Sequence, residues 1–307
     1  MSRKDKKRIG LVIGRERDLP EALTAAINAH YDDLHMEMVQ MGGTYLDELS
    51  PYSVIIDRMS HEIPYYRTYV KFAFLQGCYL INNPFTWSVD NKFFATALAK
   101  YYGWHTPRTV VLPNKDVATD VVPDSFRNLK YPMDWEGIIQ YIGTPAIFKD
   151  VRSGGRRFAH RVHNVEELIQ RYDESGTRTV LLQQVLDTDQ HVHCLVIGQE
   201  KTLLLPYSLA SGRYYDELVE PDSALGQQMI QAALSLTRFY RYDINMLEFV
   251  ILDEQLYVIS CTNPSPLMDQ TLMTPKQFEW IVAEIAQLAV DRARNPLPQL
   301  TPLAIRH

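Results

Sequence analysis

Short apolar runs alternate with amphipathic stretches over the first third of the chain. Two stretches repeat apolar residues at helical spacing: Leu19–His30, with Pro20 in its first turn, and Tyr65–Gln76, with Gly77 after it. The apolar runs around them are predicted to be strands, at Arg8–Ile13, Met36–Met41, Tyr52–Asp57 and Tyr79–Asn82. Strands that alternate with helices predict an α/β fold with a parallel sheet.

The rest of the chain predicts two hairpins and further helices. Pro145–Val162 has the pattern of a strand, a small-residue turn and a returning strand, and Met246–Ile251 with Gln255–Ile259 forms a second hairpin. Val180–Leu186 has the composition of a buried strand. Residues 113–143 lack a simple period and are left open as a lid edge or a partner surface around Trp135. Helices are predicted from the Ser88–Lys92 entry to Gly103, over Asp222–Tyr240 and over Pro275–Ala293.

The composition describes a globular chain and argues against several classes of function. Of its 307 residues, 46% are hydrophobic and 22% are charged, enough for two or three lobes with a large core. The net charge of −6 argues against a general nucleic-acid binder. The apolar run Ile9–Ile13 is too short for a signal peptide or a membrane span. Cys78, Cys194 and Cys261 form no CxxC pair, which favours a reducing, cytoplasmic location over a disulfide scaffold or a zinc site.

Polar residues follow the first and third predicted strands. In open parallel sheets, ligands lie beyond the carboxyl ends of the strands. This rule places Arg15, in the loop after the first strand, and Arg58 and His61, after the third, where a substrate would bind. Arginines at this edge favour a substrate that carries carboxylates. Ordinary surface polarity at strand ends explains the same residues, and both interpretations stay open.

The hairpin Pro145–Val162 carries a pattern for binding an anion. Lys149 ends its first strand, and Ser153, Gly154 and Gly155 form its turn, with arginines at 152, 156 and 157 around them. Glycines let the backbone approach a ligand closely, and successive N–H groups in such a turn form an anion site. The pattern suits a polyphosphate, although an ordinary hairpin with a basic tip explains it as well. It is not a P-loop, because no Gly-Lys-Ser/Thr and no helix follow.

Lys92, Glu248 and Asn263 are further candidates. Lys92 stands in the first turn of a predicted helix, where its charge opposes the helix dipole unless an anion is bound there. In a hairpin that turns at residues 252–254, Glu248 and Asn263 lie at the same end of the sheet, where oxygen ligands suit Mg²⁺. Alternatively, Glu248 is an exposed strand residue and Asn263 a turn residue before Pro264.

Taken in order along the chain, these motifs resemble the ATP-grasp superfamily, the fold of glutathione synthetase, D-alanine–D-alanine ligase and the ribosomal-protein glutamate ligases. The resemblance implies a Rossmann-like N-terminal pre-ATP-grasp domain over residues 1–84. It also implies a small ATP-grasp subdomain over 85–182 and a C-terminal subdomain over 183–307, which clasp ATP. The stretches that carry it, between Lys7 and Ala293, are LINNP, DNKFFATALAKYYGWHTPRTV, PAIFKDVRSGGRRFAHRV, VLLQQVL, HCLVIGQEKTLLL and INMLEFVILDEQLYVISCTNPSP.

The resemblance also implies roles for single residues. Lys92 and Lys149 would reach the nucleotide phosphates, and the loop Ser153-Gly154-Gly155 would fold over them. Val180–Leu186 would lead into the hinge between the lobes that grip ATP. The other implied contacts are Gln183 and Val185 with Gln184 at adenine, Asp187 or Asp189 at the ribose, His193 at a phosphate or the substrate, and Glu248 and Asn263 at Mg²⁺.

One departure from the family pattern concerns the metal. Relatives carry Glu-x-Asn where this chain has Cys261-Thr262-Asn263, and Mg²⁺ does not favour a cysteine. Either a single Mg²⁺ suffices, or another acid such as Asp243 or Asp269 replaces the carboxylate, or the chain binds nucleotide without chemistry.

A second departure concerns a cation near the phosphates. Relatives often carry Asp-x-Arg where this chain has His191 and His193. Two histidines two residues apart share one face of a strand, but the sequence shows no third ligand clustered with them for a transition metal. Arg213 is the candidate that supplies the guanidinium to a phosphate or an acyl phosphate, and a solvated loop arginine is the alternative.

The mechanism implied by the resemblance is the activation of a carboxylate. ATP phosphorylates a substrate carboxylate, and an amine then attacks the acyl phosphate. Lysines and Mg²⁺ would offset the charge on the transferred phosphoryl group. Three functions stay open: a carboxylate–amine ligase, a nucleotide-binding protein that does not ligate, and a phosphotransferase. The expected partners are small-molecule carboxylate and amine substrates and, as in relatives, a second copy of the chain, with no nucleic acid and no membrane.

Overall fold

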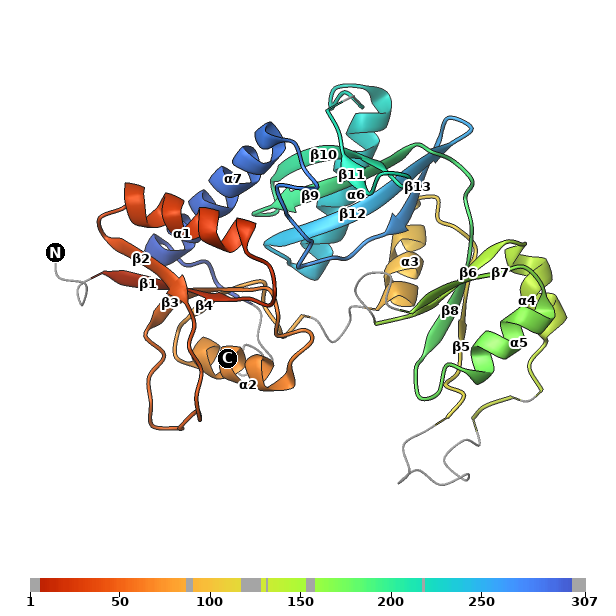
Figure 1. The fold of residues 1–307 in the computed structure, drawn as a ribbon, viewed down its shortest axis with the longest axis horizontal. Helices are drawn as coiled ribbons and strands as arrows, with labels where there is room; N and C mark the ends of the chain where they lie inside the picture. The colour runs from red at the N-terminus through yellow and green to blue at the C-terminus, as the bar shows by residue number, and fades with distance from the viewer. Residues whose placement is uncertain are drawn as a thin grey trace. The chain divides into compact units, whose positions relative to one another are not determined.

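The computed structural model describes residues 6–86, 91–116, 128–130, 132–152, 158–216 and 219–299 (Figure 1). The backbone divides into two compact units. Unit 1 contains Met1–Val89, Gln190–Glu248 and Thr262–His307, and unit 2 contains Asp90–Asp189 and Phe249–Cys261. Each unit has a hydrophobic core of its own.

A parallel four-stranded sheet begins unit 1. It consists of β1 (Lys7–Val12), β2 (Leu34–Met38), β3 (Tyr52–Asp57) and β4 (Tyr79–Ile81), in the order β2-β1-β3-β4. All neighbouring pairs are parallel, as the alternation of strands and helices predicts. β3 has the predicted bounds, whereas β2 ends three residues before the predicted Met41, because its pairing with β1 ends where Met38 meets Leu11.

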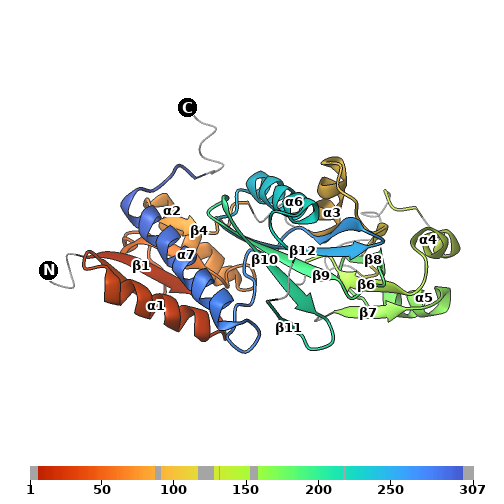
Figure 2. The same ribbon diagram turned by 90° about the horizontal axis from the view of Figure 1, so that it is seen from above.

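Helices cover both faces of this sheet (Figures 1 and 2). α1 (Asp18–His30) lies on one face beside α7 (Pro275–Arg294), and α2 (Pro64–Leu75) packs on the other. Lys7 Nζ donates a hydrogen bond to the Ala293 carbonyl oxygen at 2.8 Å, and Arg294 forms an ion pair with Asp33 at 2.7 Å. The last described helix, α7, therefore completes the core of the first sheet, which helical periodicity alone does not predict.

A second sheet has five strands in the order β11-β10-β9-β12-β13. The strands are β9 (His191–Ile197), β10 (Lys201–Ser208), β11 (Arg213–Tyr214), β12 (Ile244–Leu252) and β13 (Gln255–Ser260). α6 (Ala224–Tyr240) packs against β9 and β10. β12 and β13 are the two strands predicted to turn at residues 252–254, and the boundary between the units falls after Glu248, inside β12.

Unit 2 contains an antiparallel sheet in the order β5-β8-β6-β7. The strands are β5 (Thr109–Leu112), β6 (Ala146–Asp150), β7 (Ala159–Val162) and β8 (Val180–Gln184), and β6 with β7 confirms the predicted hairpin. One face of the sheet shares a core with α4 (Trp135–Ile142) and α5 (Val165–Asp173), while α3 (Lys92–Tyr101) contacts β5 and β13. None of the described helices is both long and apolar enough to cross a membrane.

The helices α4 and α5 are missing from the prediction, although both begin with a capping residue. The side chains of Asp134 and Asn164 accept hydrogen bonds from backbone N–H groups three residues later. Trp135, which the sequence leaves open as part of a lid or a partner surface, packs against Tyr172 with ring centroids 5.1 Å apart. Trp135 is therefore half-buried against the core of unit 2.

Asp243 is a buried acid of unit 1, directly before β12. The Tyr79 hydroxyl donates toward both carboxylate oxygens, at 3.0 and 3.1 Å, and Arg292 Nη2 lies 3.8 Å away. Burial raises the pKa of Asp243 from 3.8 to about 6, although Arg292 and the hydrogen bond from Tyr79 oppose the rise. The folded chain therefore favours the protonated acid.

We expect the free energy of unfolding to fall as the pH rises from about 4 to about 6, because Asp243 loses its proton in the folded chain over this range. The pKa is higher in the folded than in the unfolded chain, so the folded state binds the proton more tightly and loses this advantage as the pH passes the folded pKa. Urea denaturation should show the free energy of unfolding of the wild type, relative to Asp243→Asn, falling by about 3 kcal/mol over this range. A difference between the two proteins that is independent of pH would contradict the raised pKa.

Candidate functional site

The residues singled out by the sequence fall into two groups, one in each unit. Unit 1 holds Arg15, Arg58, His61, His193, Arg213, Glu248 and Asn263, and unit 2 holds Lys92, Lys149, Gln183, Gln184, Val185, Asp187 and Asp189. The predicted phosphate loop, Ser153, Gly154 and Gly155, lies outside the described residues.

In unit 2, Lys149 belongs to a row of hydrogen-bonded polar side chains on one face of the sheet. Lys149 Nζ donates to Gln183 Oε1 at 2.8 Å, and Gln183 Nε2 donates to Thr109 Oγ1 at 3.2 Å. Side chains alternate along a strand, so this row lies on the opposite face from Phe148 and Leu182, which enter the core with α4 and α5. The sheet thus positions a lysine and two neutral polar groups on the face away from α4 and α5.

The first turn of α3 lies close to the end of β6. Asn91 caps this helix, since its side chain accepts a hydrogen bond from Phe94 N at 2.8 Å. Lys92 N donates to the carbonyl oxygen of Val151 at 3.0 Å, and Val151 is two residues, or about 7 Å of extended chain, past Lys149. A helix N-terminus and two lysines in one neighbourhood favour the binding of an anion.

The end of β8, with Gln183 and Gln184, and the stretch after it are the predicted contacts with adenine and ribose. β8 ends at Gln184, which donates from its backbone N–H to Arg108 O at 2.9 Å. Val185 beyond it is half-buried, and Asp187 and Asp189 are exposed. Thr188 Oγ1 donates to Ile251 O at 2.8 Å, which holds this stretch against the part of β12 that belongs to unit 2. The assignment of the stretch to a nucleotide stays a prediction.

In unit 1, three rings lie together on one face of the five-stranded sheet. His193 Nδ1 lies 2.9 Å from the Tyr214 hydroxyl, and the imidazole stacks on the Tyr207 ring with centroids 4.7 Å apart. Burial lowers the pKa of His193 against the opposing effect of Glu248, and burial followed by Glu248 raises the pKa of Tyr214. At neutral pH, the cluster therefore presents uncharged rings near the Glu248 carboxylate.

Asn263 is held beside β12, close to Glu248. Its carbonyl oxygen accepts a hydrogen bond from Met246 N at 3.0 Å, and its N–H donates to Asn245 Oδ1 at 2.9 Å. Met246 precedes Glu248 by two residues, or about 7 Å of extended chain. The backbone thus brings the two candidate oxygen ligands to the same end of the sheet.

The donor set around Glu248 and Asn263 has the chemistry of an open Mg²⁺ site, and its assignment to a metal stays a prediction. Cys261 is buried, and its thiol donates to Ala95 O of α3 at 3.1 Å. Within the described ranges, no group of three His, Cys, Asp or Glu side chains could hold a metal ion. Glu248 and Asn263 supply the oxygen atoms that Mg²⁺ prefers, and in nucleotide sites phosphates and waters complete its shell.

Two acids considered as replacements for the missing carboxylate are engaged elsewhere in unit 1. Asp243 is bound by Tyr79, five residues or about 16 Å of extended chain from Glu248. Asp269 accepts hydrogen bonds from the hydroxyl and the N–H of Thr271, at 2.6 and 2.7 Å, and these lower its pKa. Both carboxylates therefore have structural partners of their own.

Arg213 is exposed and is not brought together with His193. It pairs with Ser208 on β10, whereas the next residue, Tyr214, pairs with Tyr207 and contacts His193. Because side chains alternate along a strand, the register places Arg213 on the opposite face from these rings. A contact between Arg213 and a phosphate stays a prediction that this register does not favour.

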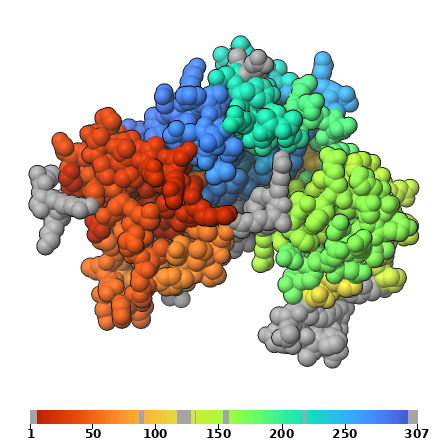
Figure 3. All heavy atoms as spheres, in the orientation of Figure 1, coloured from red at the N-terminus to blue at the C-terminus, as the bar shows by residue number. Residues whose placement is uncertain are grey.

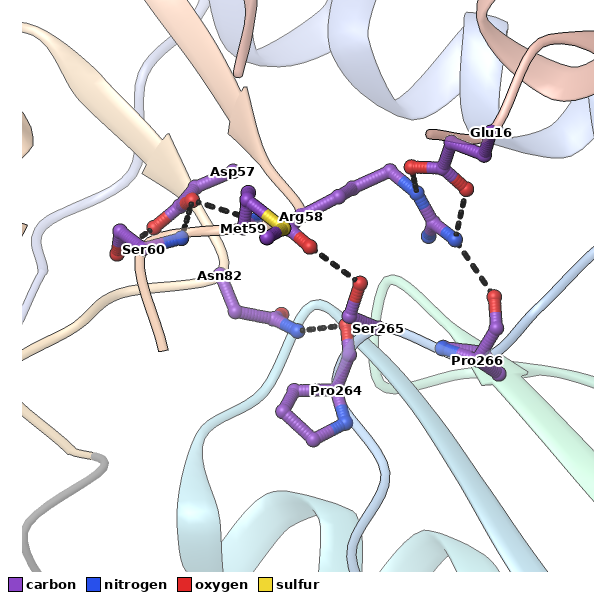
Figure 4. A network of polar contacts seen from close by, with 9 residues as sticks. All are labelled: Glu16, Asp57, Arg58, Met59, Ser60, Asn82, Pro264, Ser265 and Pro266. Atoms are coloured by element: carbon purple, nitrogen blue, oxygen red, sulfur yellow. Dashed lines mark hydrogen bonds and ion pairs between the residues drawn. The ribbon is translucent and has the colours of Figure 1, made fainter. Parts of the chain in front are cut away.

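At the edge of the parallel sheet, Arg58 is buried in an ion pair (Figure 4). Its Nε and Nη2 donate to the two carboxylate oxygens of Glu16 at 2.5 and 2.7 Å, and Nη2 also donates to Pro266 O at 2.6 Å. Ser265 Oγ donates to Arg58 O at 2.8 Å. This network fixes the carboxyl ends of β1 and β3 to the segment after β13. Arg15 nearby in the sequence is exposed, and His61 is half-buried.

The structure adds several polar residues to the candidate site that the sequence analysis did not single out. Glu16 stands between the arginines of the first loop, but its pairing with Arg58 depends on the fold. Tyr207 and Tyr214 belong to no motif, and only the alternation along β10 signals that Tyr207 shares a face with Leu205, the partner of His193.

Solved structures of similar fold cover almost the whole chain. The VanG D-Ala:D-Ser ligase from Enterococcus faecalis matches with a TM-score of 0.68 at 12% identity, over 94% of this chain and 99% of that one. D-alanine–D-alanine ligase from Bacillus anthracis has a TM-score of 0.65 at 14% identity, with the same coverage of 94% and 99%. A RimK-domain ATP-grasp protein from Sphaerobacter thermophilus has a TM-score of 0.64 at 16% identity, over 92% and 99%. No protein-family model and no curated protein matches the sequence. The similarity in structure confirms the predicted α/β class and shows that this chain has the ATP-grasp fold.

Proposed function

We propose that this protein is an ATP-dependent carboxylate–amine ligase that works through an acyl phosphate. The observation that carries the proposal is the joint position of Lys149 at the end of β6 and Lys92 at the N-terminus of α3, on an ATP-grasp fold. The ligase from Bacillus anthracis has also been solved in complex with ATP, and another neighbour, PsnB, in complex with a precursor peptide and AMPPNP.

The roles of the residues follow from charge. Lys92 and Lys149 would neutralise phosphate oxygens of ATP, whose γ-phosphoryl group passes to a substrate carboxylate. Mg²⁺, held by Glu248 and Asn263, would offset further charge on these phosphates. The amine substrate then attacks the acyl carbon, and inorganic phosphate leaves. Because ATP supplies the driving force, the reaction needs positioning rather than a side-chain nucleophile.

A trapping experiment tests the reaction itself. Hydroxylamine attacks acyl phosphates, so incubation with MgATP, hydroxylamine and a panel of amino acids and dicarboxylic acids should give a hydroxamate and ADP in equal amounts. ADP released without hydroxamate, together with a phosphorylated product stable to hydroxylamine, would contradict ligation and indicate a phosphotransferase.

A second candidate function is nucleotide binding without ligation. The observation that favours it is Cys261, whose buried thiol contacts α3 and provides no oxygen ligand. If the remaining ligands suffice for one Mg²⁺, the thiol has only a packing role and ligation remains feasible.

Two substitutions test the metal site, which is the feature that bears on both candidates. We expect Glu248→Gln to weaken ATP binding in the presence of Mg²⁺ on the order of 10-fold, since hydrogen bonds and contacts to charged groups contribute about 1.5 kcal/mol or more. Cys261→Ala should leave the Mg²⁺ dependence unchanged, and Asp253→Asn, at the β12–β13 turn, serves as the matched control. Calorimetric titration measures all three. Equal affinities for Glu248→Gln and Asp253→Asn would remove Glu248 from the metal site.

A further inference from the structure

His193 lies where the five-stranded sheet of unit 1 leaves the hydrophobic core. Alternate residues of β9 share one face, and on this face Ile197 and Leu195 are buried in the core, with exposures of 2% and 0%. His193 is the next residue on the face and is only half-buried. In Figure 3, the teal and blue atoms of unit 1, which include β11 and β12, lie packed together. The face therefore passes from a closed core to an accessible surface at His193.

Two tyrosines hold the imidazole of His193 on two sides. The Tyr207 ring stacks on it, with centroids 4.7 Å apart and an angle of 18° between the ring planes. The Tyr214 ring meets it edge-on, with centroids 5.4 Å apart. β10 and β11 place the two tyrosines directly opposite each other. These contacts restrict rotation of the imidazole and keep Nδ1 turned toward the Tyr214 hydroxyl, at 2.9 Å.

The hydrogen bond at Nδ1 decides which nitrogen of His193 carries the proton. The Tyr214 hydroxyl has one proton and two neighbours that could accept it, His193 Nδ1 at 2.9 Å and Met246 Sδ at 3.5 Å. A thioether sulfur is a weak acceptor. A phenol is a better proton donor than a neutral imidazole, and an imidazole nitrogen is a better acceptor than a phenol oxygen. The hydroxyl therefore donates to Nδ1, and the neutral ring carries its own proton on Nε2.

Nε2 is the ring atom that remains for a ligand. Among the described residues, none forms a hydrogen bond with Nε2 of His193, and Nε2 is not one of the polar atoms buried without a partner. Burial lowers the pKa of His193 while Glu248 opposes the shift, so the Glu248 carboxylate lies near the ring. The N–H group on Nε2 is thus an accessible, uncharged donor beside one of the two candidate Mg²⁺ ligands.

We propose that Tyr214 positions His193 as the Nε2–H tautomer and that this N–H group donates a hydrogen bond to an oxygen of the acyl phosphate. A neutral donor suits an anionic oxygen, whereas an ammonium group offers it no acceptor, so His193 would contact the activated carboxylate and not the protonated amine. The acceptor rests on the proposed function, but the tautomer is a property of the free protein and is measured without ATP or turnover.

Nitrogen-15 NMR of the imidazole rings measures the tautomer directly, because protonated and unprotonated ring nitrogens differ widely in chemical shift. At about pH 8 an ordinary histidine is neutral, and the signals that His193→Gln removes belong to His193. We expect Nε2 to carry the proton in the wild type. Met246→Leu, the matched control, removes only the weak acceptor and should leave the tautomer unchanged, whereas Tyr214→Phe should let both tautomers appear. A proton on Nδ1 in the wild type would overturn the proposal.

Two small probes test what the donor binds. Acetyl phosphate, added with Mg²⁺ at concentrations on the order of 10 mM, should shift the Nε2 signal of His193 in a saturable way, and methylammonium should not. No shift with acetyl phosphate, or an equal shift with methylammonium, would overturn the assignment of the acceptor.

Hydroxamate formation separates this proposal from the proposed function. If the wild type ligates, His193→Leu should lower kcat on the order of 100-fold, because it removes a donor to the reacting oxygen. His193→Gln should retain more of the activity, since its amide keeps an N–H donor, and circular dichroism checks that both variants fold. Equal kcat values for the wild type and His193→Leu would overturn the catalytic role. A wild type whose Nε2 signal shifts with acetyl phosphate but which forms no hydroxamate would contradict ligation and support the donor.

Discussion

Replacing Lys149 with methionine is expected to lower the affinity for ATP on the order of 100-fold, because hydrogen bonds to charged groups contribute about 1.5–3 kcal/mol and a second charge remains at Lys92. Lys149 lies on the edge of a row that includes Gln183 and Thr109, and its Nζ is held at 2.8 Å from Gln183 Oε1. Methionine keeps most of the side-chain length and removes the charge, so the change isolates the contribution of the ammonium group. Calorimetric titration of ATP in the presence of Mg²⁺ measures it.

Lys115→Met is the matched control for this substitution. Lys115 is an exposed lysine of the same unit that forms an ion pair with Asp173 at 2.5 Å and has no place in the candidate site. Its removal should change ATP affinity less than about 2-fold, since exposed ion pairs contribute little. Thermal unfolding of Lys149→Met should stay close to that of the wild type, because Gln183 keeps its hydrogen bond to Thr109. Equal losses of affinity in both lysine variants would show a general charge effect and no phosphate contact.

Truncation of Glu16 should destabilise the fold by about 3–5 kcal/mol, since removing one partner of a buried ion pair leaves the other charge uncompensated. In Glu16→Ala, the guanidinium of Arg58, whose side chain is only 3% exposed, would keep Pro266 O as its described hydrogen-bond acceptor. Urea denaturation followed by tryptophan fluorescence measures the change in the free energy of unfolding.

Asp33→Ala is the matched control for Glu16→Ala, because Asp33 also pairs with an arginine but lies at the surface. Asp33 pairs with Arg294 at 2.7 Å, but both side chains are nearly half exposed, so Asp33→Ala should destabilise the fold far less than Glu16→Ala does. If Glu16→Ala costs no more than Asp33→Ala, the Arg58–Glu16 pair does not hold the sheet edge together, and Arg58 becomes available for the substrate contact predicted from the sequence.

Elements with strong local signals could be predicted from the sequence. β3 is a continuous apolar run that ends at an aspartate, and the β6–β7 hairpin is bounded by strand residues on either side of a small-residue turn. α5 has a signal of the same kind, the capping residue Asn164 followed by apolar residues at Leu168 and Tyr172, but it is short enough for a loop prediction to compete.

Local sequence patterns do not predict which helices and strands pack against one another. Periodicity shows that α7 buries one side, but not that this side packs on α1 and the first sheet, because the contact of Lys7 with Ala293 joins residues 286 positions apart. The resemblance to ATP-grasp proteins predicts an order of lobes along the chain, which local patterns do not, and these domain bounds stay a prediction.

In the candidate site, too, local features could be predicted from the sequence, whereas tertiary contacts could not. The departure at Cys261 is visible in the sequence, but the contact of its thiol with Ala95 O is a tertiary feature that no spacing indicates. The substrate role predicted for Arg58 rested on its place at a strand end, whereas its burial depends on Glu16 and on Pro266, which is 208 positions away. Strand-end position therefore indicates where a polar residue lies, but not whether its charge is already satisfied.

Titration of the wild-type protein with ATP, in the presence and absence of Mg²⁺, is the decisive test of whether this chain binds a nucleotide through a metal ion. We expect one nucleotide bound per chain, with an affinity that Mg²⁺ raises about 10-fold or more, because the proposed ligands Glu248 and Asn263 would hold the ion beside the phosphates. Binding that is indifferent to Mg²⁺ would support the nucleotide-binding protein without ligation. The absence of any binding at ATP concentrations on the order of 1 mM would contradict the proposed function and leave the ATP-grasp fold alone established.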